Sequence, residues 1–257
     1  MNDHINHIIK EQVEKAWRTE NRSKIAVPFV PYVGPCYSKA SKKVLIVGKA
    51  TDGWGWKGED WNKESTLDDV DICSSSWFEE LATTAERFIE KKIIPFYSNN
   101  AGYNCDNRGY NSLFWNRTYR ILSNLLTGHP LKSYERRADL AKTAFRSFAW
   151  TNVFKIAPKR GNPPKKLRET QFDYNTLRHE IEHLKPDVVL FFTAPGYDGI
   201  LKKVLPTISI DSKKIARVAG LGKEDFGGIA LRTYHPQYWK FDMQEVVTRI
   251  RAEATPI

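Results

Sequence analysis

The sequence predicts an α/β fold in which a doubly wound parallel sheet lies between layers of helices. Short apolar runs rich in β-branched residues are typical of strands buried on both faces. Segments with helical spacing of apolar residues separate these runs, which favours parallel strands joined by helices. A length of 257 residues, 41% of them hydrophobic, suffices for one large core. We therefore expect a single domain over 1–257, with an N-terminal helix and connector at 1–42.

The first buried run, at 43–48, organises the rest of the prediction. It ends at Gly48 and leads into a loop rich in Gly and Trp, which neither a strand nor a helix interior tolerates. In open α/β sheets, ligands bind beyond the carboxyl ends of the strands, so we expect the site here. Three further strands are expected, at 149–157, 187–193 and 229–234, and a short one at 214–219 is left open.

Apolar residues at helical spacing predict the remaining elements. The clearest helix covers 113–126 and ends at Gly128. Other helices are expected at 3–20, 76–92, 134–147, 172–184, 197–204 and 241–253. We expect an Asn-rich loop at 98–112 and a basic loop at 158–168.

Charge and cysteine usage narrow the class of protein. Lys and Arg outnumber Asp and Glu by 40 to 30, and the net charge of +10 suits a polyanionic partner such as DNA. The three cysteines form no CxxC pair and fit reduced thiols, so we expect no disulfide, zinc or iron–sulfur site. There is no apolar run of 18 residues and no recognisable signal peptide, so we expect a cytoplasmic protein with no membrane segment.

Polar side chains follow the predicted strands at the points where they end. Lys49 and Asp52 follow the first strand, Asn152 lies on the second, and His235 comes directly after the fourth. Each has a purely structural reading, since a buried amide must find a partner and a histidine often caps or packs. Their joint position at one edge of a parallel sheet favours a site.

These pieces follow a familiar order. TNVFKIAP (151–158), LKPDVVLFF (184–192) and TYHPQYW (233–239), with Phe-Trp at the start of the 113–126 helix, resemble the uracil-DNA glycosylase superfamily. The resemblance spans about 42–254. It implies a three-layer α/β/α fold with a central four-stranded parallel sheet, base flipping, and cleavage of the N-glycosidic bond without a cofactor or metal. It implies no obligatory protein partner.

The resemblance also implies roles for individual residues. His235 matches the histidine that stabilises negative charge on the departing base, and Asn152 matches the asparagine of the base-binding strand. Gly48 and Lys49 match the start of the first motif, whose backbone faces the base. Two residues after this glycine the family usually carries an acid, Asn or Ala followed by Pro; here Ala50 and Thr51 occupy these positions, so no acid is present at 50 and Thr51 replaces the Pro.

The residue types present suit this chemistry. Asp52 is the nearest acid that would orient the attacking water, and Tyr110 and Phe114 are the aromatic residues expected to stack on the extruded base. The cations expected to grip the DNA backbone are Lys155, Lys159, Arg160, Lys165 and Lys166.

We therefore predict a monofunctional DNA glycosylase that leaves an abasic site. Three alternatives stay open: a glycosylase for hypermodified bases of phage DNA, a non-catalytic DNA-binding module, and a zinc hydrolase using HEIEH (179–183). The apolar stripe Leu177, Ile181 and Leu184 turns both histidines of that motif toward solvent, which disfavours the zinc reading.

Overall fold

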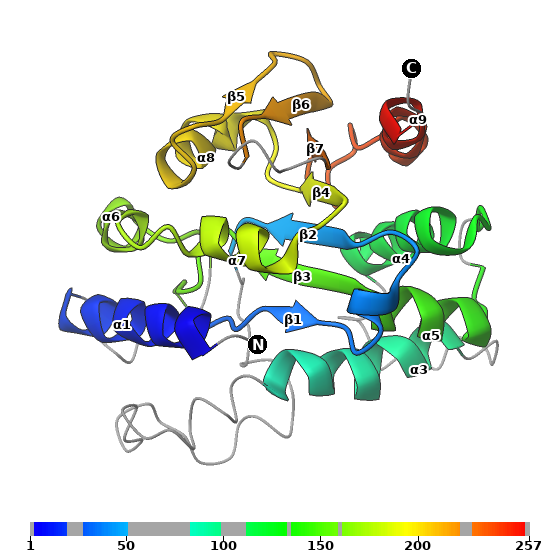
Figure 1. Ribbon diagram of the computed structural model, residues 1–257, viewed down its shortest axis with the longest axis horizontal. Helices are drawn as coiled ribbons and strands as arrows, with labels where there is room; N and C mark the ends of the chain where they lie inside the picture. The colour runs from blue at the N-terminus through cyan, green and yellow to red at the C-terminus, as the bar shows by residue number, and fades with distance from the viewer. Residues whose placement is uncertain are drawn as a thin grey trace.

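The computed structural model describes residues 3–19, 28–50, 83–98, 112–132, 135–158, 161–221 and 228–254. Its centre is one mixed sheet of seven strands in the order β1-β3-β2-β4-β7-β6-β5 (Figure 1). The strands are β1 Tyr32–Val33, β2 Val44–Gly48, β3 Phe148–Asn152, β4 Val188–Phe191, β5 Ser209–Ile210, β6 Ala216–Ala219 and β7 Ile229–Arg232.

The α/β class expected from the sequence is confirmed, but the sheet is larger than four strands. The middle strands β3, β2, β4 and β7 pair in parallel, whereas β1, β6 and β5 add antiparallel edges. β1 and β5 have two residues each, which is too short to show a periodicity in the sequence. β1 lies in the Pro-rich segment expected to be a connector, and it pairs with β3 through Tyr32 and Val33.

The α-helices surround this sheet. They are α1 Asp3–Thr19, α3 Ile94–Ser98, α4 Leu113–Thr127, α5 Ala138–Arg146, α6 Lys165–Phe172, α7 Thr176–Leu184, α8 Asp198–Val204 and α9 Met243–Ala254. A π-helix, η3 Ile89–Ile93, precedes α3, and two 3₁₀ turns are η2 Tyr37–Lys39 and η4 Pro195–Tyr197.

α4 has the ends that its sequence predicts. Ser112 accepts a hydrogen bond from the backbone N–H of Trp115 at 3.3 Å and so caps the helix start. Gly128 ends the helix in the left-handed conformation, with φ 72°, where a side chain would be strained. These two ends fix where Phe114 and the residues one and two turns later lie.

Two helical expectations are corrected. The helix expected at 172–184 begins only at Thr176, as α7, because Asn175 has a positive φ of 47°, and Phe172 is instead the last residue of a separate helix, α6. α6 starts after Pro164, so the last four residues of the expected basic loop, 165–168, are helical. The described part of the helix expected at 76–92 continues through η3 and α3 to Ser98, while 76–82 lies outside the described residues.

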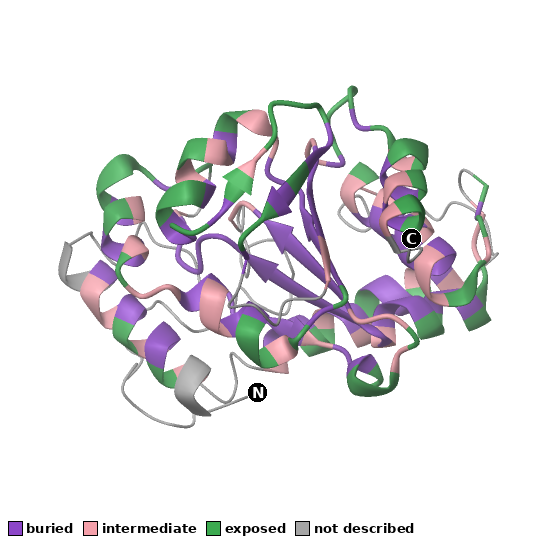
Figure 2. Cartoon of the chain, turned by 45° about the horizontal axis from the view of Figure 1, so that its top comes forward, coloured by how far each residue is buried: buried purple, intermediate pink, exposed green. Residues whose placement is uncertain are grey.

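Both faces of the sheet are covered by apolar side chains, which alternate along each strand. Val44 and Ile46 of β2 pack in a core with residues of α3, α4, α5 and α9. Leu45 and Val47 pack in a second core with residues of α7 and α8. Figure 1 shows these two groups of helices on opposite sides of the sheet, and Figure 2 shows the strands buried between them.

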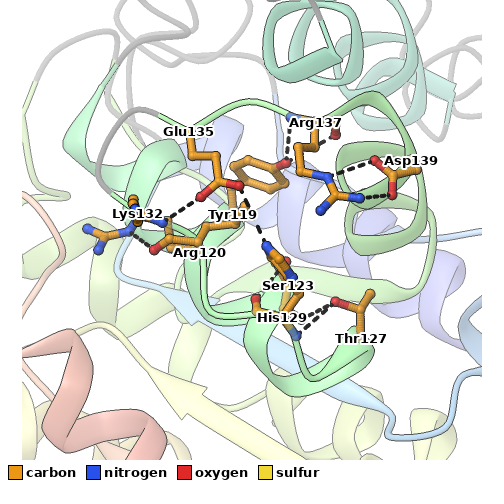
Figure 3. Close-up of polar contacts among 10 residues, drawn as sticks. Tyr119, Arg120, Ser123, Thr127, His129, Lys132, Glu135, Arg137 and Asp139 are labelled. Atoms are coloured by element: carbon orange, nitrogen blue, oxygen red, sulfur yellow. Dashed lines mark hydrogen bonds and ion pairs between the residues drawn. The ribbon is translucent and has the colours of Figure 1, made fainter.

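Polar contacts fix the connection between α4 and α5 (Figure 3). The Tyr119 hydroxyl donates to the Arg137 carbonyl at 3.1 Å and accepts from the Arg137 N–H at 3.2 Å. The Ser123 hydroxyl donates to the His129 carbonyl at 3.1 Å, and Nε of Arg120 donates to the Leu131 carbonyl at 3.2 Å. α4 is therefore held firmly behind the residues that it presents to the site.

Candidate functional site

The carboxyl ends of the parallel strands meet at one edge of the sheet, as the sequence predicts. Gly48 at the end of β2 lies opposite Asn152 at the end of β3. Val47 lies opposite Phe191 of β4, and Phe191 lies opposite Arg232 of β7. Residues that follow these strands, including His235, are therefore delivered to the same edge.

Gly48 and Asn152 lie close together at this edge. A Cβ atom on Gly48 would lie 2.2 Å from Oδ1 of Asn152, so only glycine fits beside the amide. Asn152 is 2% exposed, and its Nδ2 has no hydrogen-bond partner among the described residues. A buried donor without a partner costs about 1–3 kcal/mol, so this amide is suited to pair with a ligand.

Phe114 brings α4 against the same edge. Its ring stacks on the His235 imidazole, with 5.6 Å between ring centroids and 25° between ring planes. It also contacts Phe192 after β4, at 6.0 Å, and Trp150 of β3, at 6.2 Å. Trp150 and Asn152 share one face of the sheet, because residues two apart on a strand do. The aromatic wall and the amide therefore belong to one side of the sheet.

His235 is neutral at physiological pH. Burial and the nearby positive charge of Lys49 lower the pKa of its imidazole to about 4. Nδ1 of His235 accepts a hydrogen bond from the Gln237 backbone N–H at 3.3 Å. Because Nδ1 is the acceptor, the ring proton lies on Nε2, and His235 offers a neutral N–H donor.

Lys49 supplies positive charge at the end of β2. Partial burial lowers the pKa of its ammonium group, and its Nζ lies 5.3 Å from the centroid of the Tyr197 ring. The same charge acts on His235, so the edge between β2 and the His235 loop favours an anion.

Arg117 holds the loop that carries His235, a contact that was missed in the sequence. Its Nη1 donates to the Pro236 carbonyl and to the Tyr238 carbonyl, the latter at 3.0 Å. Its guanidinium also lies 5.2 Å from the Phe241 ring centroid. The only sequence signal is spacing, since Arg117 follows Phe114 by three residues and shares its face of α4.

The prediction that Lys155 grips the DNA backbone is wrong. Lys155 is 1% exposed, and its ammonium group donates to Glu180 at 2.8 Å, to the Thr151 hydroxyl and to the Asn152 carbonyl. Thr151 in turn donates to Glu180 at 2.8 Å. Burial lowers the pKa of Lys155 and raises that of Glu180. Lys155 thus supports the end of β3 from within.

The other predicted residues fall into two groups. Lys165 and Lys166 are exposed, but on the first turn of α6 and not on a loop; Lys165 lies 3.8 Å from Glu169. The second group lies outside the described residues: Asp52, Tyr110, Lys159 and Arg160.

Backbone strain at the end of β4 was not foreseen. Ala194 has φ 67° and ψ 159°, a conformation that costs a non-glycine residue about 1–3 kcal/mol and tends to occur at functional sites. The side-chain oxygens of Thr193 and Thr233 beside it are buried and have no hydrogen-bond partner among the described residues. These hydroxyls are further polar groups that a ligand at this edge can satisfy.

The HEIEH segment does not form a metal site within the described part of the chain. Its two histidines are partly or fully exposed, whereas Glu180 points inward to Lys155. Among the described residues, no three His, Cys, Asp or Glu side chains are grouped to hold a metal ion. None of the described helices is both long and apolar enough to cross a membrane.

No model of a known protein family matches this chain, and a search of curated proteins finds no significant match.

Proposed function

We propose that this chain is a DNA glycosylase of the uracil-DNA glycosylase type, which binds an extruded base and hydrolyses its N-glycosidic bond. The observation that carries the proposal is the meeting of Asn152, Phe114 and His235 at one edge of the parallel strands. The amide of Asn152 is buried and its Nδ2 lacks a partner among the described residues, as expected of a group that waits for a ligand.

Each of these groups has a part in such a reaction. The Asn152 side chain carries a donor and an acceptor and is able to pair with the edge of a base. The aromatic wall around Phe114 offers an apolar surface to a flat heterocycle. Extruding the base costs a few kcal/mol, which these contacts would offset.

The leaving base carries away the electron pair of the glycosidic bond, so it departs as an anion. The neutral Nε2–H of His235 would donate to the oxygen on which this charge builds, as an oxyanion hole does. Lys49 would add a positive potential at the same place. We propose Asp52, from the segment 51–82 outside the described residues, as the group that orients the attacking water.

We also propose that the fold has the three-layer core of this superfamily. The parallel strands β3, β2, β4 and β7, with helices on both faces, would form the three-layer α/β/α core of that superfamily. β1, β5 and β6 would then be additions at the two edges of this core.

A panel of labelled oligonucleotides tests the function. Single- and double-stranded DNA carrying uracil, hypoxanthine, modified cytosines or phage-type hypermodified bases is incubated with the protein and then treated with hot alkali, which cleaves abasic sites. We expect cleavage at one class of base. Tight binding without cleavage on every substrate would favour the non-catalytic binding module, and neither binding nor cleavage would contradict the proposal.

A further inference from the structure

A basic hollow lies beside the loop that follows His235. It has a volume of about 490 Å³ and is lined from α4, from the segment before β6, from the loop after His235 and from the first turn of α9. We call it the α4–α9 hollow. Its cations are Arg117, Arg120, Lys214 and Lys240.

No acidic residue of the described segments pairs with the two arginines of the hollow. Arg117 and Arg120 are half-buried, and neither forms an ion pair with a carboxylate of the described residues. Burial lowers the pKa of both, and the charge of Arg117 lowers that of Arg120 further. Two like charges kept together and partly desolvated are stabilised by an anion between them.

The acids of the hollow do not supply that anion. Oδ1 of Asp242 accepts a hydrogen bond from the Glu245 N–H at 3.0 Å, which caps the start of α9. Glu245 lies in the first turn of α9, where the helix dipole favours a carboxylate. Both acids therefore have local partners, and the cations of the hollow remain in excess.

The hollow continues the candidate site along α4. Phe114, Arg117 and Arg120 are spaced by three residues, so each lies about 60° around the helix from the one before, over roughly 9 Å along its axis. That length is about the rise of two to three nucleotides in one DNA strand. Arg117 joins the two places directly, because it also binds the carbonyls of the His235 loop.

We infer that the α4–α9 hollow binds backbone phosphates of the nucleic-acid strand next to the nucleotide whose base is held at Asn152 and His235. This inference rests on the proposed function and adds a second contact region to it. Phosphate oxygens suit guanidinium groups, which present several N–H donors in a fixed plane. Lys214 and Lys240 extend the site toward its rim as point charges.

The inference is tested with two variants and a control. The variants are Lys214→Ala and Lys214→Ala/Lys240→Ala, and the control is Lys213→Ala. Lys213 and Lys214 are both exposed, but only Lys214 lines the hollow. Binding of the full chain to a fluorescein-labelled DNA oligonucleotide is measured by anisotropy over a range of salt concentrations. The slope of log K against log[salt] is negative. We expect it to become less steep by about 0.7–0.9 for Lys214→Ala and by about twice that for the double variant. The control should keep the wild-type slope.

The outcomes separate this inference from the proposed function. If all variants keep the wild-type slope, or if the slope changes equally in Lys213→Ala and Lys214→Ala, the α4–α9 hollow does not bind phosphates. Base excision by saturating wild-type protein would still stand in that case. A wild-type chain that binds no DNA would overturn both ideas.

Discussion

At the scale of single residues, the site depends on how closely Gly48 and Asn152 approach. The amide oxygen of Asn152 occupies the space that any side chain at position 48 would need. The two residues come from neighbouring strands and are 104 positions apart in the chain, yet they are paired in the sheet. The orientation of the amide is therefore set by the sheet register, which rigid strands maintain.

Gly48→Ala tests this packing. The added Cβ would meet the Asn152 amide at 2.2 Å, so the amide must turn away or the strands must separate. We expect a loss of about 1–3 kcal/mol in the free energy of unfolding and at least a tenfold loss of excision, about 1.4 kcal/mol in barrier. Urea denaturation and single-turnover kinetics measure the two effects.

Gly199→Ala is the matched control. A Cβ at Gly199 in α8 meets nothing within 4 Å, so excision should be unchanged and stability equal or raised by up to about 1 kcal/mol. If the two alanine variants have equal free energies of unfolding and equal excision rates, the close contact at Gly48 is unimportant.

The low pKa of His235 makes a pH-dependent prediction. Between pH 6.5 and about 4, the unfolded chain binds a proton on His235 that the folded chain does not. Stability should therefore fall as the pH falls through this window, and it should stop falling from this cause below about pH 4. The free energy of unfolding of His235→Gln, measured by urea denaturation across the same pH range, should not show this decrease.

The same pKa predicts the pH profile of catalysis. A neutral donor needs no added proton, so the ratio of wild-type to His235→Gln excision rates should stay constant from about pH 8 to pH 5. A ratio that collapses above pH 6.5 would show instead that the imidazolium form is the active one.

Some site residues were predictable from the sequence and others were not, for a physical reason. Asn152 ends β3 and His235 follows the end of β7 by three residues. Parallel strands bring their carboxyl ends together, so the proximity of these two residues follows from pattern alone. Lys155 carries the same charge as its neighbours in sequence, and nothing local shows that it turns inward to Glu180. Arg117 acts through backbone carbonyls, which leave no trace in residue types.

At the scale of elements, the buried pair Lys155–Glu180 joins the end of β3 to α7. All three ammonium protons have acceptors, one of them the carbonyl of Asn152 itself. Glu180, one of the two acids of the HEIEH segment, therefore has a structural position beneath the site. Such a pair is a weak source of net stability, but losing one partner leaves a buried charge without compensation.

Removing one partner of this pair is therefore predicted to be costly. We expect Lys155→Met or Glu180→Leu to lower the free energy of unfolding by about 3–5 kcal/mol, measured by urea denaturation. The double variant Lys155→Met/Glu180→Leu should recover much of that loss, because no charge is left unpaired. Single losses below about 1 kcal/mol, or additive losses in the double variant, would contradict a coupled pair.

The sequence pattern predicts some secondary-structure elements and not others. Each of the four apolar runs contains one parallel strand, because burial on both faces leaves a strong signal, although β3 ends at Asn152 and not at 157. The edge strand β1 is stabilised by pairing with β3, and β5 by pairing with β6. Each has only two residues, which is too few to show an alternating pattern in the sequence. The break between α6 and α7 depends on a left-handed backbone at Asn175, which asparagine permits but does not require.

At the scale of the whole molecule, the net charge of +10 is spread over more than one surface. The α4–α9 hollow carries one set of cations, and a second hollow of about 300 Å³ includes Lys165, Arg168 and Lys203. Several phosphate contacts at separate places favour an extended polyanion over a small anion.

Lys165→Ala/Lys166→Ala tests the second surface. Both lysines are exposed on α6, so the fold should be unaffected. We expect weaker DNA binding and a salt slope smaller by about 1–2, without a change in excision by saturating protein. An unchanged slope in anisotropy measurements would remove α6 from the DNA-binding surface.

The most direct test of the central claim is release of a free base by the wild-type chain and by two asparagine variants. Asn152→Ala removes the amide at the strand edge, whereas Asn124→Ala removes an amide of similar burial on α4, away from the strand ends. Mass spectrometry of the products should detect a free base with the wild-type chain and with Asn124→Ala, and at least a hundredfold slower release, about 2.7 kcal/mol, with Asn152→Ala. Equal release by the two variants, or no free base from any modified DNA, would contradict the account.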